Sequence, residues 1–96
     1  MTEQQYKEYL RGCLNQAAAA IKLYKETITA VQTYNTQTAI KWFEMAESYK
    51  ICALQDYDRV FRKLCAMDQE KTIEYIETTL LNAAHSARNA ISNILH

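Results

Sequence analysis

A chain of 96 residues with no proline and a single glycine, Gly12, has few ways to form tight turns. Average proteins contain about 7% Gly and about 5% Pro, and hairpins, bulges and glycine-rich phosphate loops depend on these residues. Their near-absence argues against a β-sandwich, a barrel or a nucleotide-binding loop. Because 49% of the residues are apolar, the chain is also too hydrophobic for a disordered tail. The composition therefore predicts an all-α fold.

Three stretches of the chain carry apolar residues at spacings of mostly three and four, which is typical of the buried face of a helix. The first stripe consists of Leu10, Leu14, Ala17, Ile21, Tyr24, Ile28 and Val31. The second consists of Ala39, Phe43, Ala46, Ala53, Tyr57, Val60, Leu64 and Met67. The third consists of Ile73, Ile76, Leu80, Ala83, Ala87, Ala90 and Ile94. The pattern predicts helices over about residues 3–33, 37–66 and 69–95, with Gly12 on the outer face of the first.

The predicted helices are bounded by polar residues that can cap them. Thr2 and Gln5 match the capping box of a helix N-terminus, and the polar segment 33–38 separates the first two helices. Asp68 is expected to cap the third helix. Since both connections are short, consecutive helices should be antiparallel neighbours. The predicted architecture is one domain, residues 1–96, folded as an elongated up-down-up three-helix bundle of long antiparallel helices.

The charge balance and the hydropathy argue against two classes of partner. Eleven Lys and Arg residues offset eleven Asp and Glu residues, so the chain lacks the positive net charge typical of a nucleic-acid-binding protein. No apolar run approaches the roughly 20 residues that span a bilayer, and the polar start at residues 1–5 does not resemble a signal peptide. We therefore expect a cytoplasmic protein that binds neither nucleic acid nor a membrane.

The three cysteines, Cys13, Cys52 and Cys65, are odd in number and lack CxxC spacing. This argues against a disulfide framework and against a structural zinc site. We expect buried free thiols, because an unpaired cysteine packs as a small hydrophobic residue. The sequence thus gives no indication of a metal or of another cofactor.

The second predicted helix has more apolar surface than one buried stripe needs. Trp42, Met45 and Tyr49 lie on a flank of this stripe. Part of the excess is expected, since a helix in a three-helix bundle contacts two neighbours. The remainder would form a patch for a protein partner or for self-association, because aromatic and Met side chains are enriched at interfaces. We predict that these three residues bind a partner.

Lys50 lies within the predicted buried arc of the same helix. A buried lysine costs several kcal/mol unless it is paired or neutral. One interpretation is that its aliphatic stem packs on apolar surface while the ammonium reaches water. The other is that the charge is kept for an acidic group of a partner or for the register of the bundle. The second interpretation makes Lys50 a candidate partner-binding residue.

Residues 84–90 read AHSARNA and place His85 on the outer face of the third helix, one turn from Arg88. An exposed imidazole can accept a phosphoryl group, and a nearby cation can stabilise the added charge. The string resembles the phosphoacceptor motif A-H-S-x-K-G of histidine-phosphotransfer domains, with Arg88 in place of the lysine and Asn89 in place of the glycine. It is also similar to the H-x-x-K/R-N string of sensor-kinase dimerisation helices. The resemblance implies that His85 is a phosphoacceptor with Arg88 as its electrostatic partner; the alternative is an ordinary surface histidine.

The sequence indicates no other catalytic arrangement. Glu44 and Glu47 are expected on the outer face of the second helix, without a histidine at metal-binding spacing. No nucleophile is paired with a base, so we do not expect an enzyme. The leading hypothesis is a non-catalytic protein-interaction module that binds and occludes a protein partner, such as a small inhibitor, an immunity or anti-defence protein, a chaperone or an adaptor. The alternatives are a histidine-phosphotransfer protein and a structural homo-oligomer such as a homodimer.

Overall fold

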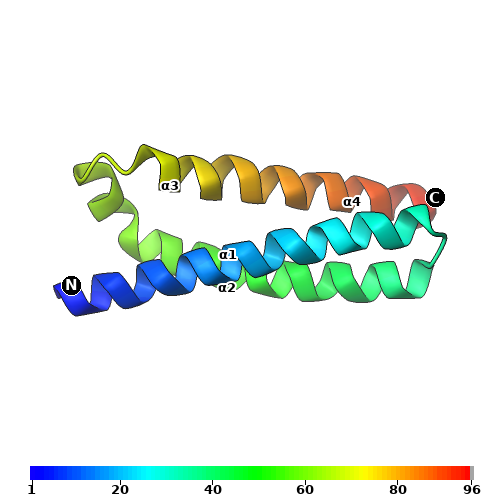
Figure 1. Ribbon diagram of the computed structural model, residues 1–96, viewed down its shortest axis with the longest axis horizontal. Helices are drawn as coiled ribbons and strands as arrows, with labels where there is room; N and C mark the ends of the chain where they lie inside the picture. Colours follow the sequence, from blue (N-terminus) through cyan, green and yellow to red (C-terminus); the bar gives the residue numbers. More distant parts are fainter. Residues whose placement is uncertain (96) are drawn as a thin grey trace.

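The computed structural model describes residues 1–95 and confirms the predicted all-α bundle. Helix α1 spans Glu3–Gln32, and α2 spans Thr36–Ala66. The third rod is continuous and consists of α3 (Glu70–Glu74), the π-helical segment η1 (Tyr75–Leu80) and α4 (Leu81–Leu95). The rods run antiparallel in sequence order, so the chain starts and finishes at opposite ends of the bundle (Figure 1). The extents of 47 × 19 × 16 Å give the elongated shape expected of long helices.

Helix α1 begins with the predicted capping box. The Thr2 hydroxyl accepts a hydrogen bond from the Gln5 backbone N–H (3.1 Å), and the Gln5 side-chain oxygen accepts one from the Thr2 N–H (3.0 Å). These bonds satisfy two donors that have no partner within the first turn of the helix. Helix α2 begins similarly, since the Asn35 side chain accepts a hydrogen bond from the Thr38 N–H (3.3 Å).

The turn between α1 and α2 closes without glycine. The Asn35 N–H donates to the Ala30 carbonyl (2.9 Å). The Tyr34 N–H donates to the Val31 carbonyl (3.0 Å). This pair of bonds is the Schellman pattern, in which the first residue beyond the helix adopts a left-handed conformation. Tyr34 occupies that position with a φ of 59°.

The second turn repeats this pattern, and the predicted role of Asp68 as the cap of the third helix is wrong. Asp68 has a φ of 54° and its N–H donates to the Cys65 carbonyl (3.2 Å), so it terminates α2 instead. The Gln69 N–H donates to the Leu64 carbonyl (3.0 Å). Aspartate tolerates the left-handed region better than most residues. Gln69 is consequently the N-cap residue of α3, without a side-chain capping bond.

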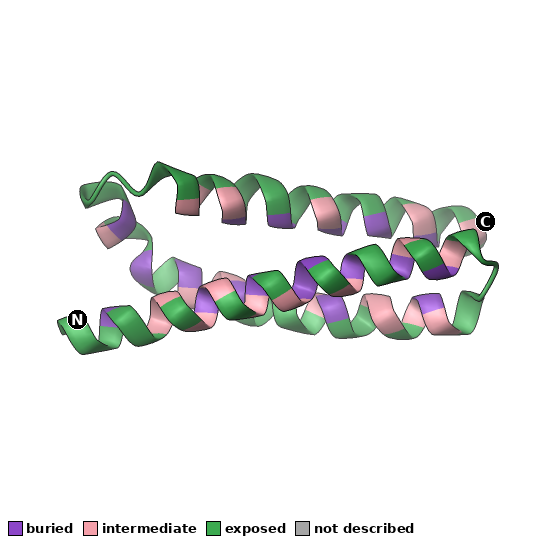
Figure 2. Cartoon of the chain, viewed as in Figure 1, coloured by how far each residue is buried: buried purple, intermediate pink, exposed green. Residues whose placement is uncertain are grey.

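Many of the buried positions of the bundle carry small side chains. The fully buried alanines are Ala17 and Ala20 of α1, Ala39, Ala46 and Ala53 of α2, and Ala87 of α4. The distance between two packed helices depends on the side chains at their contact, so alanine allows a close approach. Larger buried residues such as Tyr24, Leu64 and Ile76 complete the core. Figure 2 shows the buried residues on the inner sides of the rods.

The third rod contains an irregularity that the apolar spacing does not reveal. In the π-helical segment Tyr75–Leu80, hydrogen bonds span one residue more than in an α-helix. Beyond it, Ala84 and Ile91 are buried, whereas Ala83 and Ala90 of the predicted stripe are only half-buried. Ala87 of the predicted stripe is fully buried, so the buried face of α4 is only partly offset from the predicted face.

Gly12 faces α2 rather than solvent, so its predicted place on the outer face is wrong. A Cβ atom built at Gly12 would lie 2.5 Å from Oδ2 of Asp56. The Asp56 carboxylate is half-buried and pairs with Arg59 at 3.6 Å. The absence of a side chain at Gly12 therefore leaves room for this carboxylate between the two helices.

The cysteines are unpaired, as predicted, but they are not all buried. Cys13 is buried, and burial together with the nearby charge of Asp56 raises the pKa of its thiol to about 11. Cys52 and Cys65 are exposed on α2. The expectation of buried thiols is therefore wrong for these two residues, which lie outside the buried stripe of the helix.

We predict that the effect of replacing Gly12 by alanine depends on Asp56. Alanine favours a helix over glycine by about 1 kcal/mol, but its methyl group would meet the Asp56 carboxylate. In an Asp56→Ala background, Gly12→Ala should raise the free energy of unfolding by about 1 kcal/mol. In the parent chain the gain should be smaller by at least about 0.5 kcal/mol. Urea unfolding of the four chains measures this coupling, and equal gains would contradict the contact.

Replacement of Tyr34 by glycine should stabilise the fold, because glycine adopts the left-handed conformation without a steric cost. We expect the free energy of unfolding to rise by about 0.5–1 kcal/mol. The matched control is Gln32→Gly, in the last turn of α1, which should lower it by about 1 kcal/mol. Thermal and urea denaturation report both values. Destabilisation by both substitutions would show that Tyr34 is not left-handed.

Candidate functional site

A surface groove of about 420 Å³ runs between α1 and α2, and we call it the α1–α2 groove. It is lined by Ala19, Lys22, Leu23 and Glu26 of α1 and by Trp42, Met45 and Tyr49 of α2. Within each set the residues are one, three or four positions apart, so each set lies on one side of its helix. Two adjacent helix surfaces therefore form the site.

The groove contains the three large side chains that the sequence predicts as partner-binding. Met45 and Tyr49 are 39% and 42% exposed, and Trp42 is partly buried against a small core cluster. They lie beside the buried stripe of α2 rather than within it, so each keeps part of its surface in water. The structure brings Trp42, Met45 and Tyr49 together, and their role in binding stays a prediction.

The residues of α1 in this groove were not predicted from the sequence. Lys22 and Glu26 are exposed and place one cation and one carboxylate next to the apolar side chains. Ala19 also lines the groove, with a small side chain. Their spacing along α1 places them on one side of the helix, but only the register of α1 against α2 shows that this side faces Trp42 and Met45.

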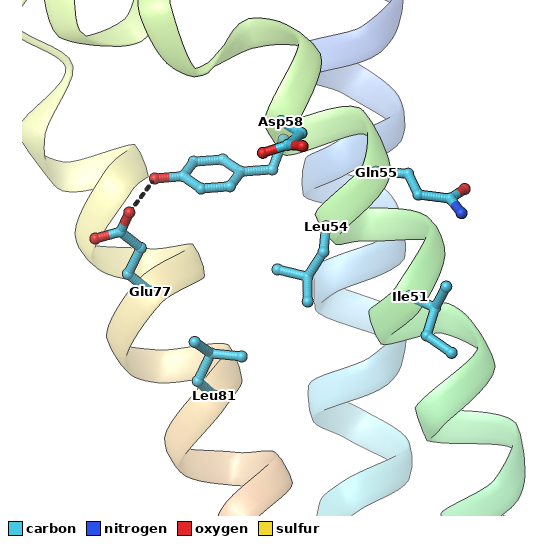
Figure 3. Close-up of a pocket in the computed structure, with 7 residues that line it drawn as sticks. Ile51, Leu54, Gln55, Asp58, Glu77 and Leu81 are labelled. Carbon is cyan, nitrogen blue, oxygen red and sulfur yellow. Dashed lines mark hydrogen bonds between the residues drawn. The ribbon is translucent and has the colours of Figure 1, made fainter.

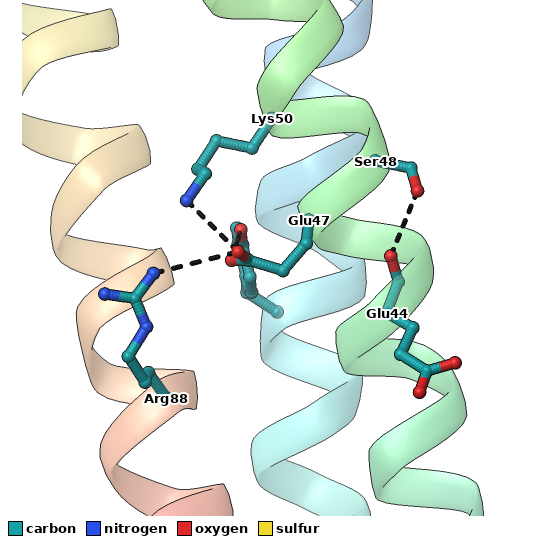
Figure 4. Close-up of polar contacts among 6 residues, drawn as sticks. Glu44, Glu47, Ser48, Lys50 and Arg88 are labelled. Carbon is teal, nitrogen blue, oxygen red and sulfur yellow. Dashed lines mark hydrogen bonds and ion pairs between the residues drawn. The ribbon is translucent and has the colours of Figure 1, made fainter.

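Lys50 lies outside the α1–α2 groove, on the side of α2 that faces α4. Its side chain is 14% exposed, and its ammonium group pairs with the Glu47 carboxylate at 3.3 Å. Figure 4 shows both side chains extending from α2 toward α4. The structure thus separates Lys50 from the other predicted partner-binding residues and gives its charge a partner within the chain.

Glu47 is the centre of a polar cluster that joins all three rods. Its carboxylate accepts a hydrogen bond from the Tyr24 hydroxyl of α1. It also pairs with Lys50 of α2 and, at 3.7 Å, with Arg88 of α4. The expectation that Glu47 lies on the outer face is wrong, because α4 packs along that flank of α2 (Figure 4). Glu44 is exposed, as predicted.

The charge state of this cluster follows from its contacts. Burial alone would raise the pKa of the Glu47 carboxyl group, but the hydrogen bonds from Tyr24 and Lys50 and the nearby positive charges outweigh it and hold the pKa below its ordinary value. Burial, and then the hydrogen bond to the carboxylate, raise the pKa of the Tyr24 hydroxyl. At neutral pH the cluster therefore contains an ionised Glu47 and a neutral Tyr24.

The cluster predicts a contribution to stability that is lost in acid. Because the pKa of Glu47 is lower in the folded chain, this contribution is fully present above its ordinary value of 4.5 and disappears as the pH falls through the folded-state pKa. We expect Glu47→Gln to lower the free energy of unfolding by about 1–2 kcal/mol at about pH 7. At about pH 3 the loss should be less than about half as large.

Urea unfolding at the two pH values measures these losses. Glu44→Gln is the matched control, since Glu44 is exposed on the same helix, and it should change stability by less than about 0.5 kcal/mol. A loss for Glu47→Gln that does not depend on pH would contradict the ionised cluster.

His85 is exposed on α4, as the phosphotransfer hypothesis requires. Its Nε2 atom lies 3.2 Å from the side-chain Nδ2 of Asn89. Arg88, its predicted electrostatic partner, is directed toward Glu47 on α2 instead (Figure 4). Phosphotransfer through His85 stays a prediction that rests on the sequence string.

Among residues 1–95, which the structure describes, no three His, Cys, Asp or Glu side chains are grouped so that they could hold a metal ion. None of the helices in this part of the chain combines the length and the apolar character that crossing a membrane requires.

Comparisons of the chain with protein-family models, with curated proteins and with solved structures gave no significant match.

Proposed function

We propose that the chain is a non-catalytic protein-interaction module that binds a protein partner through the α1–α2 groove and occludes the surface it covers. The observation that carries this proposal is the grouping of Trp42, Met45 and Tyr49 along one flank of α2. Trp and Tyr contribute much of the binding free energy at many protein interfaces, and an exposed Met adapts its shape to a partner.

The polar residues of the groove support the same proposal. Lys22 and Glu26 lie one turn apart on α1, beside the apolar side chains of α2. Protein interfaces commonly combine an apolar centre with a polar rim. Rim charges contribute more to orientation and to the association rate than to affinity. The large side chains of α2 would therefore provide the affinity, and the two charges would orient the partner.

The exposure of the groove favours a protein over a small molecule as the ligand. Pockets for small molecules bury about 70–90% of the ligand surface. Met45 and Tyr49 instead lie partly exposed on the side of a bundle 47 Å long. A partner that packs along α1 and α2 would bury these side chains and have its own contact surface blocked, which is the mechanism of an occluding inhibitor or chaperone.

Site-specific photo-crosslinking in an extract of the source organism tests this proposal. A photoreactive amino acid in place of Met45 should capture a defined protein. The same group in place of Tyr34, which is exposed in the turn between α1 and α2, should not capture it. The captured protein is then purified and titrated with the chain by calorimetry. Identical capture from both positions would argue against the α1–α2 groove.

The substitution Met45→Asp should weaken binding of the captured protein by at least about tenfold, which corresponds to about 1.4 kcal/mol. The matched control is Met67→Asp, because Met67 is an exposed methionine at the other end of α2. It should bind as the parent chain does. Undiminished binding by Met45→Asp would contradict the proposal.

A further inference from the structure

A second and larger groove, of about 750 Å³, lies between α2 and the third rod, and we call it the α2–η1 groove. It is lined by Ile51, Leu54, Gln55, Tyr57 and Asp58 of α2, by Glu77 of η1 and by Leu81 of α4. Figure 3 shows Leu54 and Leu81 between the two rods, with Asp58 and Glu77 nearer the end where α2 finishes. The groove thus has an apolar part and an acidic part.

The two grooves lie on different flanks of α2. Met45 and Leu54 are nine positions apart, which at 3.6 residues per turn places them about 180° apart around the helix. The buried stripe of α2 runs between the two flanks. A ligand in the α2–η1 groove would therefore not contact Trp42, Met45 or Tyr49, and this inference does not depend on the function proposed for the α1–α2 groove.

Apolar side chains in the α2–η1 groove are left partly uncovered by the fold. Ile51 is 53% exposed and Leu81 is 39% exposed, on opposite sides of the groove. Leu54 is half-buried. Ile51, Leu54 and Asp58 follow at spacings of three and four along about 10 Å of α2. This pattern and length match about two turns of a second helix packed alongside, which is the helix-in-groove mode of recognition.

The charge of the groove defines the complementary ligand. Asp58 and Glu77 are its charged residues, and no Lys or Arg of the described chain lines it. One oxygen of Glu77 accepts a hydrogen bond from the Tyr57 hydroxyl (2.7 Å). The second carboxylate oxygen retains acceptor capacity, as does Asp58, which is exposed. Cationic side chains therefore complement this groove.

The π-helical segment provides an independent observation at the same place. Glu77 belongs to η1, and Leu81 is the first residue beyond it. Segments of π-helix are rare and often occur at functional sites. Here the segment carries the hydrogen bond between Tyr57 and Glu77, which connects the two sides of the groove (Figure 3).

We propose that the α2–η1 groove binds an amphipathic helix of a partner protein, with apolar residues at positions i, i+4 and i+7 and with Lys or Arg on its flanks. The apolar residues of this helix pack against Ile51, Leu54 and Leu81. Its cations pair with Asp58 and Glu77. With the α1–α2 groove on its other flank, α2 then carries two binding surfaces, which is the arrangement of an adaptor.

The test uses the full chain, labelled with ¹⁵N, and two synthetic peptides of about 18 residues. The first peptide has Leu at i, i+4 and i+7 and Lys on its flanks; the second has Glu in place of every Lys. We expect the Lys peptide to shift the amide signals of the α2–η1 groove while the Trp42 indole signal stays in place. The Glu peptide should bind at least about tenfold more weakly.

Two substitutions locate the binding surface. Leu81→Asp should weaken binding of the Lys peptide by at least about tenfold. Leu95→Asp, at an exposed leucine of the same helix, should leave the affinity unchanged. Asp58→Asn changes an exposed side chain without perturbing the core and should weaken binding of the Lys peptide by about threefold or more. The Glu peptide should bind this variant with the same or slightly higher affinity.

Three results would overturn the proposal. The first is equal affinity for the Lys and Glu peptides. The second is a set of peptide-induced shifts centred on Trp42, Met45 and Tyr49, which would assign the peptide to the other groove. The third is concentration-dependent self-association that Leu81→Asp abolishes in sedimentation equilibrium, because a second copy of the chain would then occupy the groove. If Met45→Asp no longer binds the partner of the α1–α2 groove, the peptide affinities, the amide shifts and the sedimentation result all stay the same.

Discussion

The close contact between α1 and α2 determines how the rest of the molecule is arranged. Fully buried alanines, Ala17 and Ala20 on α1 and Ala46 and Ala53 on α2, allow the two backbones to approach. The third rod makes more of its contacts with α1 than with α2. Both flanks of α2 consequently keep partly exposed apolar side chains, and these form the two grooves. The surface offered to partners is therefore a result of the packing of one pair of helices.

The cluster around Glu47 adds a constraint that alanine packing does not provide. Small apolar side chains make similar contacts when one helix slides along another, whereas a carboxylate with partners on three rods is satisfied in one register. Each of its partners is charged or can donate a hydrogen bond, so these contacts compensate the half-buried carboxylate for its loss of hydration. Lys50, which stands out in the sequence as a cation in an apolar arc, has its structural partner here.

Much of the fold follows from the spacing of apolar residues, because α1 and α2 are regular helices and most of the stripe predicted for α2 is buried. In α1, Cys13 and Thr27 are buried, whereas Leu14 and Ile28 of the predicted stripe are half-buried. The π segment of the third rod could not be predicted either, because it depends on backbone hydrogen bonds that side-chain periodicity does not encode. Gly12 and Glu47 were assigned to the outer face because a helical pattern gives the direction of a side chain but not the neighbour that covers it. The large residues of the α1–α2 groove could be predicted because they lie on one flank of a single helix. Lys22 and Glu26 could not, because only the packing of α1 against α2 brings them to the groove.

The odd number of rods has a geometrical consequence. A chain that crosses the bundle an even number of times returns to the pole where it began, but this one crosses it three times and has its ends at opposite poles (Figure 1). Segments joined to the two ends would therefore leave in opposite directions, separated by a stiff spacer with the bundle's length of 47 Å. In such a fusion the bundle would set the distance between its neighbours, while the sides of α2 stayed accessible along the whole of that span.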